Sequence, residues 1–566
     1  MQKRWTVQKH DRTRAAEFAR ELGLSPLCAA ILIARGYDTV EKAESFLNPS
    51  LEHLHDPLLM LGLGKACDRL FKAAEKGEKV LVWGDYDVDG TTGTVLLRSV
   101  FKLIGLESGY HIPNRFTEGY GVNQPALEKA KDDGYSLVIT VDCGIRSFEP
   151  LEWARENGLD VIVTDHHLSD EVNGNPPAWA VVNPNQPGCT YPDKHLAGVG
   201  VAFKLAHELL RRAGKESYVP SFLKVAAIGT IADIMKLTGE NRAIVALGLR
   251  DLPSTRNYGL KALMEVADCH SEMTSYHIGF RIAPRINAAG RMDVAKHVVE
   301  LFEATDFDQA RGLADLLDSK NRERQLIQQK ITELALLNSK DIDLHDFVVV
   351  AGDAWHKGVI GLAASRIAEQ FHRPTIVLSV ENGVASGSAR SVSSFHLLNA
   401  LESCAELFEQ FGGHAAAAGM KIKSENIDLL RKRLNEHCLE HLLEEHRTPV
   451  LHIDAEVSSQ TMCLELLREI ERLEPCGAGN PKPVFLTRDL VLNEEPYVMK
   501  DKHLKLFLLD PRGRRFEAVW WDGVRKLNGQ TLKPKSRIEL AYSPEANHWQ
   551  GTTRLQLVVE DLRADN

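Results

Sequence analysis

Between residues 62 and about 235, short apolar runs alternate with segments of helical pattern. The runs are VLVW at 80–83, SLVITV at 136–141, DVIVT at 160–164 and AWAVV at 178–182. Such alternation is typical of a parallel sheet with helices on both faces, because a strand reaches its parallel neighbour only through a crossover. The sequence therefore predicts an α/β domain over residues 61–240.

Acids and histidines directly follow three of these runs. The carboxyl ends of parallel strands meet at one edge of a sheet, where open α/β folds place their chemistry. We expect the helix after VLVW to begin at Thr92. Asp85, Asp87 and Asp89 would then lie in the turn before it, where alternate residues project to one side. The residues expected at this edge are Asp85, Asp87, Asp89, Asp142, Asp165, His166 and His167.

Converging carboxylates repel one another unless a cation lies among them. Carboxylates with one or two imidazoles suit Mn²⁺ or Mg²⁺, whereas a structural zinc site normally uses thiolates, and only Cys143 is near. Another acid, Asp233, stands alone in the apolar segment VAAIGTIADIMKL. Buried aspartates are rare unless they are paired, so Asp233 is expected to be either a further ligand or a helix cap.

The composition limits the class of protein. With 566 residues, of which 44% are hydrophobic and 26% charged, the chain is expected to form three or four soluble domains. No apolar run is long enough to span a bilayer and no secretory signal is visible, so we expect a cytoplasmic protein. Nine scattered cysteines without a C-x-x-C pair are expected to be reduced. A net charge of −10 means that nucleic acid would have to be held by a local basic groove or by metal ions.

Four motifs, DYDVDG, VDCG, DHH and IADIM, resemble in order and spacing those of the DHH phosphoesterase superfamily. Over nearly its full length the chain resembles the RecJ family of single-stranded-DNA exonucleases. The resemblance implies two Mn²⁺ or Mg²⁺ ions, with Asp142 bridging them and acting in catalysis together with the supporting residues Asp85 and His167. It implies as metal ligands Asp87, Asp89, Asp142, His166 and Asp233.

The same resemblance implies an activity and partners. The expected reaction is hydrolysis of single-stranded DNA from the 5′ end in recombination and repair, by a monomer that works with a single-strand-binding protein and a helicase. Two other functions remain to be weighed. One is a DHH hydrolase of short oligoribonucleotides or cyclic dinucleotides, which would resemble only the first two domains. The other is a metal-free DNA-binding scaffold, which would lack ligands.

Arginines and glycines in the middle of the chain are candidates for phosphate contacts. Segment 241–344 holds RINAAGRM, where arginines stand among small residues, followed by a long helical pattern that is expected to lead across a cleft to a second α/β domain, 345–449. That domain resembles the DHHA1 domain and carries the stretches ASGSARS and FGGHAAAAGM. The residues that we expect to contact the substrate and its 5′ phosphate are Arg115, Arg285, Arg291, Ser388, Arg390 and His414.

The two ends of the chain have different patterns. Residues 450–566 contain short strands separated by turns, which predict an OB-fold barrel. Trp520, Trp521 and Trp549 there are either platforms for bases or core residues. The loop LEPCGAGNPKP has no role that composition reveals. Residues 1–60 have a helical pattern and are expected to form an accessory layer.

Overall fold

The computed structural model describes residues 3–115, 117–270, 272–337, 346–393, 395–443, 446–527, 529–549 and 551–565, apart from the side chain of Trp549. The chain divides into two compact units. The parallel-sheet unit comprises Tyr37–Arg322 and the short segment Leu473–Pro481, and the barrel-containing unit comprises Met1–Gly36, Glu323–Arg472 and Lys482–Asn566. Within the described residues, no helix combines the length and apolar character that crossing a membrane requires.

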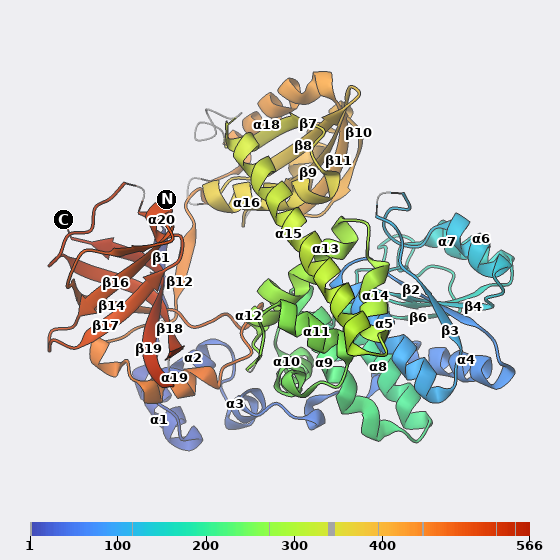
Figure 1. The fold of residues 1–566 in the computed structure, drawn as a ribbon, viewed down its shortest axis with the longest axis horizontal. Helices are drawn as coiled ribbons and strands as arrows, with labels where there is room; N and C mark the ends of the chain where they lie inside the picture. The colour runs from blue at the N-terminus through green and yellow to red at the C-terminus, as the bar shows by residue number, and fades with distance from the viewer. Residues whose placement is uncertain are drawn as a thin grey trace. The chain divides into compact units, whose positions relative to one another are not determined.

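The parallel-sheet unit is built on the predicted parallel sheet (Figure 1), which has five strands: the four apolar runs of the sequence and a strand at 108–111 that the sequence analysis does not predict. Their order is β3-β2-β4-β5-β6, and alternate residues of each strand face opposite layers of helices. Helices α4, α5 and α8 pack on one face of the sheet, and α6 and α7 pack on the other. The strands are β2 (Val80–Gly84), β3 (Ser108–His111), β4 (Leu137–Val141), β5 (Asp160–Thr164) and β6 (Ala180–Val182). The helices are α4 (Leu63–Lys76), α5 (Val88–Ile104), α6 (Gln124–Asp132), α7 (Phe148–Glu156) and α8 (Gly198–Arg212).

Helix α5 begins earlier than the sequence analysis predicts. It starts at Val88 and not at Thr92, because the Asp87 side chain accepts a hydrogen bond from the Gly90 backbone N–H and caps the helix. Asp89 therefore lies in the first helical turn, and the aspartates are not arranged by the alternation expected of a turn. An acid in the first turn is favoured by the partial positive charge of the helix N-terminus.

A helical layer completes this unit. It consists of α3 (Val40–Leu47), α9 (Val219–Ala232), α10 (Gly239–Asp251), α11 (Tyr258–Val266), α12 (Ser275–His277), the π-helical turn η5 (Ile278–Ile282), α13 (Ala283–Arg291) and α14 (Lys296–Glu303). The expected long helix is α15 (Phe307–Leu337). Its first half packs into the core of the parallel-sheet unit through Ala314 and Leu317, and its second half packs in the other unit through Ile331 and Ala335.

A second sheet follows α15, in the order β10-β11-β9-β8-β7. Strands β7 and β8 are parallel and the other neighbours are antiparallel. The strands are β7 (Val348–Asp353), β8 (Thr375–Glu381), β9 (Val384–Arg390), β10 (Phe408–Gly413) and β11 (Ala417–Lys423), and the helices are α16 (Lys357–Phe371), α17 (Leu397–Glu402) and α18 (Ile427–His441). The second α/β domain that the sequence analysis predicts after the long helix is thus present.

The C-terminal strands form the predicted OB-type barrel. In the order β14, β18, β19, β17, β16 each strand pairs with the next, and β16 pairs with β14, so the sheet returns to its starting strand. These strands are β14 (Phe485–Leu492), β16 (His503–Leu509), β17 (Arg515–Trp520), β18 (Arg537–Trp549) and β19 (Thr552–Ala564), with β13 (Ala455–Glu456), β15 (Tyr497–Met499), α19 (Leu464–Glu471) and α20 (Gly523–Lys526) beside them. Trp520 is buried and belongs to the core, whereas Trp521 is 52% exposed. The side chain of Trp549 lies outside the described residues.

The N-terminus differs from the predicted helical layer. Arg4–Val7 form strand β1, which pairs in parallel with β12 (Val450–Ile453). Helices α1 (Arg12–Leu22) and α2 (Pro26–Ala34) belong to the same barrel-containing unit, whereas α3 belongs to the parallel-sheet unit. A four-residue strand whose partner lies far away in sequence leaves no local pattern that could reveal it.

Candidate metal centre

Seven side chains converge where the strands of the parallel sheet end. They form three groups that share members. In each group every residue contributes one ligand atom, and these atoms all lie within 4.8 Å of one another. The His166 Nε2 atom lies 3.1 Å from Asp142 Oδ1, 3.5 Å from Asp233 Oδ2 and 3.9 Å from Asp89 Oδ2. The groups are Asp85, Asp87 and Asp142; Asp89, His166 and Asp233; and Asp142, His166 and His167.

The donor set fits divalent cations. Asp85 Oδ1, Asp142 Oδ1 and Asp233 Oδ2 are buried oxygens without a hydrogen-bond partner among the described residues. A buried carboxylate oxygen without a donor is costly, and a cation removes that cost. Oxygen ligands with an imidazole are those that Mn²⁺ and Mg²⁺ accept. Asp142 and His166 each take part in two of the groups. Of the two, only the carboxylate of Asp142 has two ligand oxygens, so Asp142 has the place and the chemistry that a bridging ligand needs.

Backbone geometry fixes Asp142. Its φ of 64° is left-handed, a conformation that Asp tolerates better than most residues. Its N–H donates to the Thr164 carbonyl at 3.0 Å, and its carbonyl accepts from the Tyr120 hydroxyl at 3.3 Å. The turn after β4 therefore directs the carboxylate away from the strand and into the group.

The start of helix α8 holds Asp89. The Gly198 and Val199 backbone N–H groups donate to Asp89 Oδ2 and Oδ1 at 2.6 and 2.7 Å. A Cβ at Gly198 would lie 2.5 Å from the Asp142 Cβ, so a larger residue would displace that ligand. The sequence analysis gives Gly198 no role. The sequence feature that could have revealed the role of Gly198 is its position at the start of a helix, where free backbone N–H donors attract anions.

Asp165 organises the histidine pair, although the sequence analysis gives it no separate role. Its Oδ1 accepts from His167 Nδ1 at 2.7 Å and from the His166 N–H at 2.7 Å, and its Oδ2 accepts from the Ile145 N–H. Burial lowers the pKa of His167, but the hydrogen bond and charge of Asp165 outweigh it and raise that pKa to about 9. Burial and then the charge of His167 lower the pKa of His166 to about 4. His166 is thus the neutral imidazole, which is the form that ligates metals.

Crowding raises the pKa values of the carboxylates. Burial and then the neighbouring aspartates hold the pKa values of Asp85, Asp89 and Asp142 well above the ordinary value. Burial, followed by the charge of Asp87, raises the pKa of Asp233 to about 7. These raised pKa values show that the negatively charged form of the clustered aspartates is unfavourable without a cation. A bound divalent cation would favour the charged form and lower the pKa values again.

The position of Asp233 decides between the two roles considered for it. It is the C-terminal cap residue of α9, where the helix end carries partial negative charge and a carboxylate is disfavoured. Capping by an aspartate stabilises the opposite end of a helix. The structure therefore supports a ligand role for Asp233 and gives no support to a capping role.

The predicted arginines of this unit have different surroundings. The Arg115 guanidinium lies 5.2 Å from the centre of the Tyr86 ring, and its charge partly opposes the rise in the pKa of Asp85 that burial causes. The charge of Arg291 likewise partly opposes the rise in the pKa of Asp87 that burial causes, so both arginines act on the metal group. Arg285 instead donates to Asp318 at 2.9 Å and to the carbonyls of Arg281 and Val266. These contacts give Arg285 a structural role in joining α13 to α15.

The predicted residues of the second sheet form a group of their own. Arg390 Nη1 donates to Ser388 Oγ at 2.9 Å, and a Cβ at Gly361 on α16 would lie within 3.0 Å of both side chains. Arg390 lines a hollow of about 220 Å³ together with Ser365, His372 and Ser391. His414 is exposed in the β10–β11 turn, and its backbone N–H donates to the Ala417 carbonyl.

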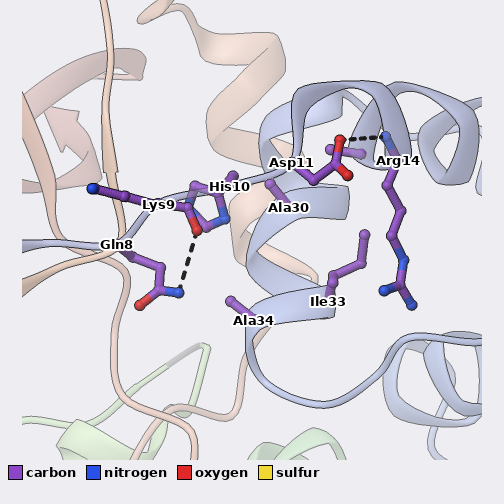
Figure 2. Close-up of a pocket in the computed structure, with 9 residues that line it drawn as sticks. Gln8, Lys9, His10, Asp11, Arg14, Ala30, Ile33 and Ala34 are labelled. Carbon is purple, nitrogen blue, oxygen red and sulfur yellow. Dashed lines mark hydrogen bonds between the residues drawn. The ribbon is translucent and has the colours of Figure 1, made fainter.

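A smaller hollow lies in the N-terminal segment of the barrel-containing unit (Figure 2). It measures about 120 Å³ and is formed by the chain after β1 together with α1 and α2. Asp11, the carboxylate that lines it, caps α1 through the Arg14 N–H, so this oxygen is already used. The arrangement is structural and differs from the groups at the sheet edge, where Asp85, Asp142 and Asp233 each have a buried oxygen without a hydrogen-bond donor among the described residues.

A parallel sheet whose strand ends gather aspartates and a neutral histidine, without a thiolate among these ligands, fits a metal-dependent phosphoesterase. Three family models match the chain: the DHH family N-terminal domain over residues 79–230, the DHHA1 domain over 345–440 and the RecJ OB domain over 453–561. The chain belongs to the RecJ family of single-stranded-DNA-specific exonucleases.

The individual relatives support this membership over the whole chain. The Bacillus subtilis exonuclease RecJ is 38% identical over 99% of this chain and 70% of the relative, and the Haemophilus influenzae protein is 35% identical over 91% and 92%. The solved structure of Thermus thermophilus RecJ in complex with Mn²⁺ matches with a TM-score of 0.84 and 29% identity, covering 100% of this chain and 80% of that one. Its complex with Mg²⁺ matches with a TM-score of 0.80.

Proposed function

We propose that this protein is a Mn²⁺- or Mg²⁺-dependent exonuclease that hydrolyses single-stranded DNA in the 5′→3′ direction, in DNA recombination and repair. The observation that carries the proposal is the convergence of Asp142 with two further sets of ligands, all at one edge of the sheet. A non-catalytic scaffold would lack such ligands, whereas each position expected to bind a metal holds an Asp or a His in this chain. The OB-type barrel argues against a hydrolase of short oligoribonucleotides, which has no need of it.

Each ligand has a place in the proposed site. Asp89, His166 and Asp233 would hold one cation and Asp87 the other, Asp142 would be shared between them, and Asp85 would support the second position. When bound, two such cations offset the negative charge on the attacking and leaving oxygens of an in-line displacement. His167, whose ring Nδ1 is held by Asp165 Oδ1 at 2.7 Å, lies beside Asp142 and can donate a hydrogen bond to a phosphate next to the cations. Asp85 and His167 therefore act next to Asp142 in catalysis.

We assign candidate contacts to the phosphates of the substrate in each unit separately. Arg115 and Arg291 lie close enough to the metal group to change its pKa values, and the paired donors of Ser388 and Arg390 suit a phosphate. His414, which is exposed in the β10–β11 turn, is a further candidate for a phosphate contact. Arg285 is assigned to the support of α13.

The remaining parts of the proposal concern the setting of the enzyme. Trp521 on the barrel stacks on bases of longer strands. We place the protein in the cytoplasm as a monomer that cooperates with a single-strand-binding protein and a helicase. The domains proposed are 1–60, 61–240, 241–344, 345–449 and 450–566.

A cleavage assay tests the proposed function. Single-stranded DNA, duplex DNA and short RNA, each labelled at either end, are compared with and without Mn²⁺. The expected result is Mn²⁺-dependent release of nucleotides from the 5′ end of single-stranded DNA and none by Asp142→Ala. Faster cleavage of short RNA, or an Asp142→Ala enzyme of normal rate, would overturn the proposal.

A further inference from the structure

The segment Leu473–Pro481 lies between α19 and β14 in the sequence, but it packs as part of the parallel-sheet unit. We call it the docked loop. It closes on itself, since Gly477 and Asn480 exchange backbone hydrogen bonds at 2.9 and 3.1 Å and the Asn480 amide donates to the Leu473 and Pro475 carbonyls. Asn480 and Leu473 are buried. The loop is therefore a preformed piece that fits onto this unit.

A buried arginine holds the first half of the docked loop. Arg242, near the start of α10, is 2% exposed, and its guanidinium donates to the carbonyls of Leu473, Glu474 and Pro475. Its Nε donates to the Phe46 carbonyl at 2.6 Å, and the guanidinium lies 3.5 Å from the centre of the Phe46 ring. Burying a guanidinium is costly unless its donors are used, and here the loop carbonyls use them.

The second half of the docked loop contacts the segment after Asp233. The Leu237 N–H donates to the Ala478 carbonyl at 2.7 Å. A Cβ at Gly479 would lie 3.1 Å from the Lys236 Cβ, and a Cβ at Gly477 would lie 2.8 Å from Leu237 Cδ1. The loop backbone thus rests directly on residues 236–238, three residues beyond a proposed metal ligand.

The turn between Asp233 and this contact is strained. Ile234 has a φ of 57°, a conformation in which a β-branched residue is an outlier, and its side chain is 75% exposed and gains little from burial. The Met235 N–H donates to the Thr230 carbonyl at the C-terminal end of α9, where Asp233 is the cap residue. Such strain persists only where surrounding contacts hold it, and it gathers at functional sites.

We infer that the docked loop positions Asp233, by holding the strained turn at Ile234, so that the metal site at the sheet edge depends on a segment from the C-terminal third of the chain. This inference deepens the proposed function, because it rests on Asp233 being a ligand. Gly479 and Arg242 are then positioning residues that act through Asp233. A truncation near residue 450 would remove part of this support together with the barrel.

Binding of Mn²⁺ alone to metal-free full-length protein, monitored by the electron paramagnetic resonance signal of free Mn²⁺, tests the inference. Gly479→Ala places a methyl group against Lys236, and we expect one of two Mn²⁺ ions to bind about 10–100-fold more weakly, the range for residues that orient a ligand. Gly214→Ala is the matched control, since Gly214 has a similar φ of 68° in the same unit and nothing within 4 Å of the added Cβ.

One further variant separates the possible failures. Asp233→Asn must also lose one ion; if it does not, the metal assignment in the proposed function is wrong. If Asp233→Asn loses an ion while Gly479→Ala binds both as tightly as Gly214→Ala does, only the role of the loop is overturned. Equal losses in Gly479→Ala and Gly214→Ala would overturn it as well, since they reflect general backbone strain.

If Gly479→Ala does not fold, Gly477→Ala takes its place, because Gly477 lacks a positive φ and its Cβ would press on Leu237. Its control is Gly312→Ala, with nothing within 4 Å. In a double-mutant cycle, Ile234→Gly relieves the strained turn, so the loss caused by the loop variant should shrink in its presence. Unchanged Mn²⁺ binding in Gly477→Ala, or a loss that Ile234→Gly leaves the same, would count against the inference.

Discussion

Replacing Asp233 by Asn should stabilise the metal-free protein while it weakens the metal-loaded one. Burial and then the charge of Asp87 raise the pKa of Asp233 from 3.8 to about 7 in the folded protein. The stability that this group contributes is fully present below pH 3.8 and is lost as the pH rises toward 7, because the folded protein holds the proton that the unfolded chain releases. Asparagine does not ionise and escapes this loss.

The magnitude depends on the size of the shift. A pKa difference of about 3 units at 1.36 kcal/mol each corresponds to about 4 kcal/mol at pH 8, where Asp233 is charged in both states. At pH 5 the folded protein keeps its proton, and the advantage of Asp233→Asn falls to about 2 kcal/mol. With saturating Mn²⁺ the order reverses, because the wild type binds the metal more tightly and is stabilised by mass action.

Scanning calorimetry of protein freed of metal, at pH 5 and pH 8, measures this difference. The transition of the parallel-sheet unit should shift upward in Asp233→Asn, and more at pH 8. Asp315→Asn, on the exposed surface of α15 in the same unit, controls for the loss of a surface charge. An equal shift at both pH values, or a metal-free Asp233→Asn protein that is less stable than the wild type at pH 8, would refute the reasoning.

Four other substitutions give three separate tests. Gly198→Ala places a Cβ 2.5 Å from that of Asp142 and should weaken Mn²⁺ binding about 10–100-fold, measured by titration; unchanged binding would contradict the role of this glycine. Arg390→Ala should cost roughly 1.5–3 kcal/mol in kcat/KM on 5′-phosphorylated strands and narrow their advantage over 5′-hydroxyl strands; equal impairment on both ends would indicate a structural ion pair. Trp521→Ala should weaken binding of long strands by about 1–3 kcal/mol without lowering Tm, whereas Trp520→Ala should lower Tm by removing a core residue; the reverse pattern would contradict their assignment.

The sequence by itself determines the sheet and its ligand-bearing edge. Apolar runs such as VLVW and DVIVT are strands because they can be buried on both faces, and the residues directly after a parallel strand lie at the carboxyl edge. The order of the motifs therefore indicates that Asp142 and His166 come together, and the structure brings them within 3.1 Å. Short-range patterns of this kind need no knowledge of distant residues.

Tertiary structure alone decides the contacts between segments that are far apart in the sequence. Gly198 supports Asp89 across more than a hundred residues, and the docked loop, to which composition assigns no role, rests on the turn after Asp233. Likewise, Asp318 engages Arg285, an arginine that the sequence analysis assigns to phosphate. Sequence patterns report which residues can be buried or charged, but the partner that a buried donor or acceptor finds depends on how the whole chain packs.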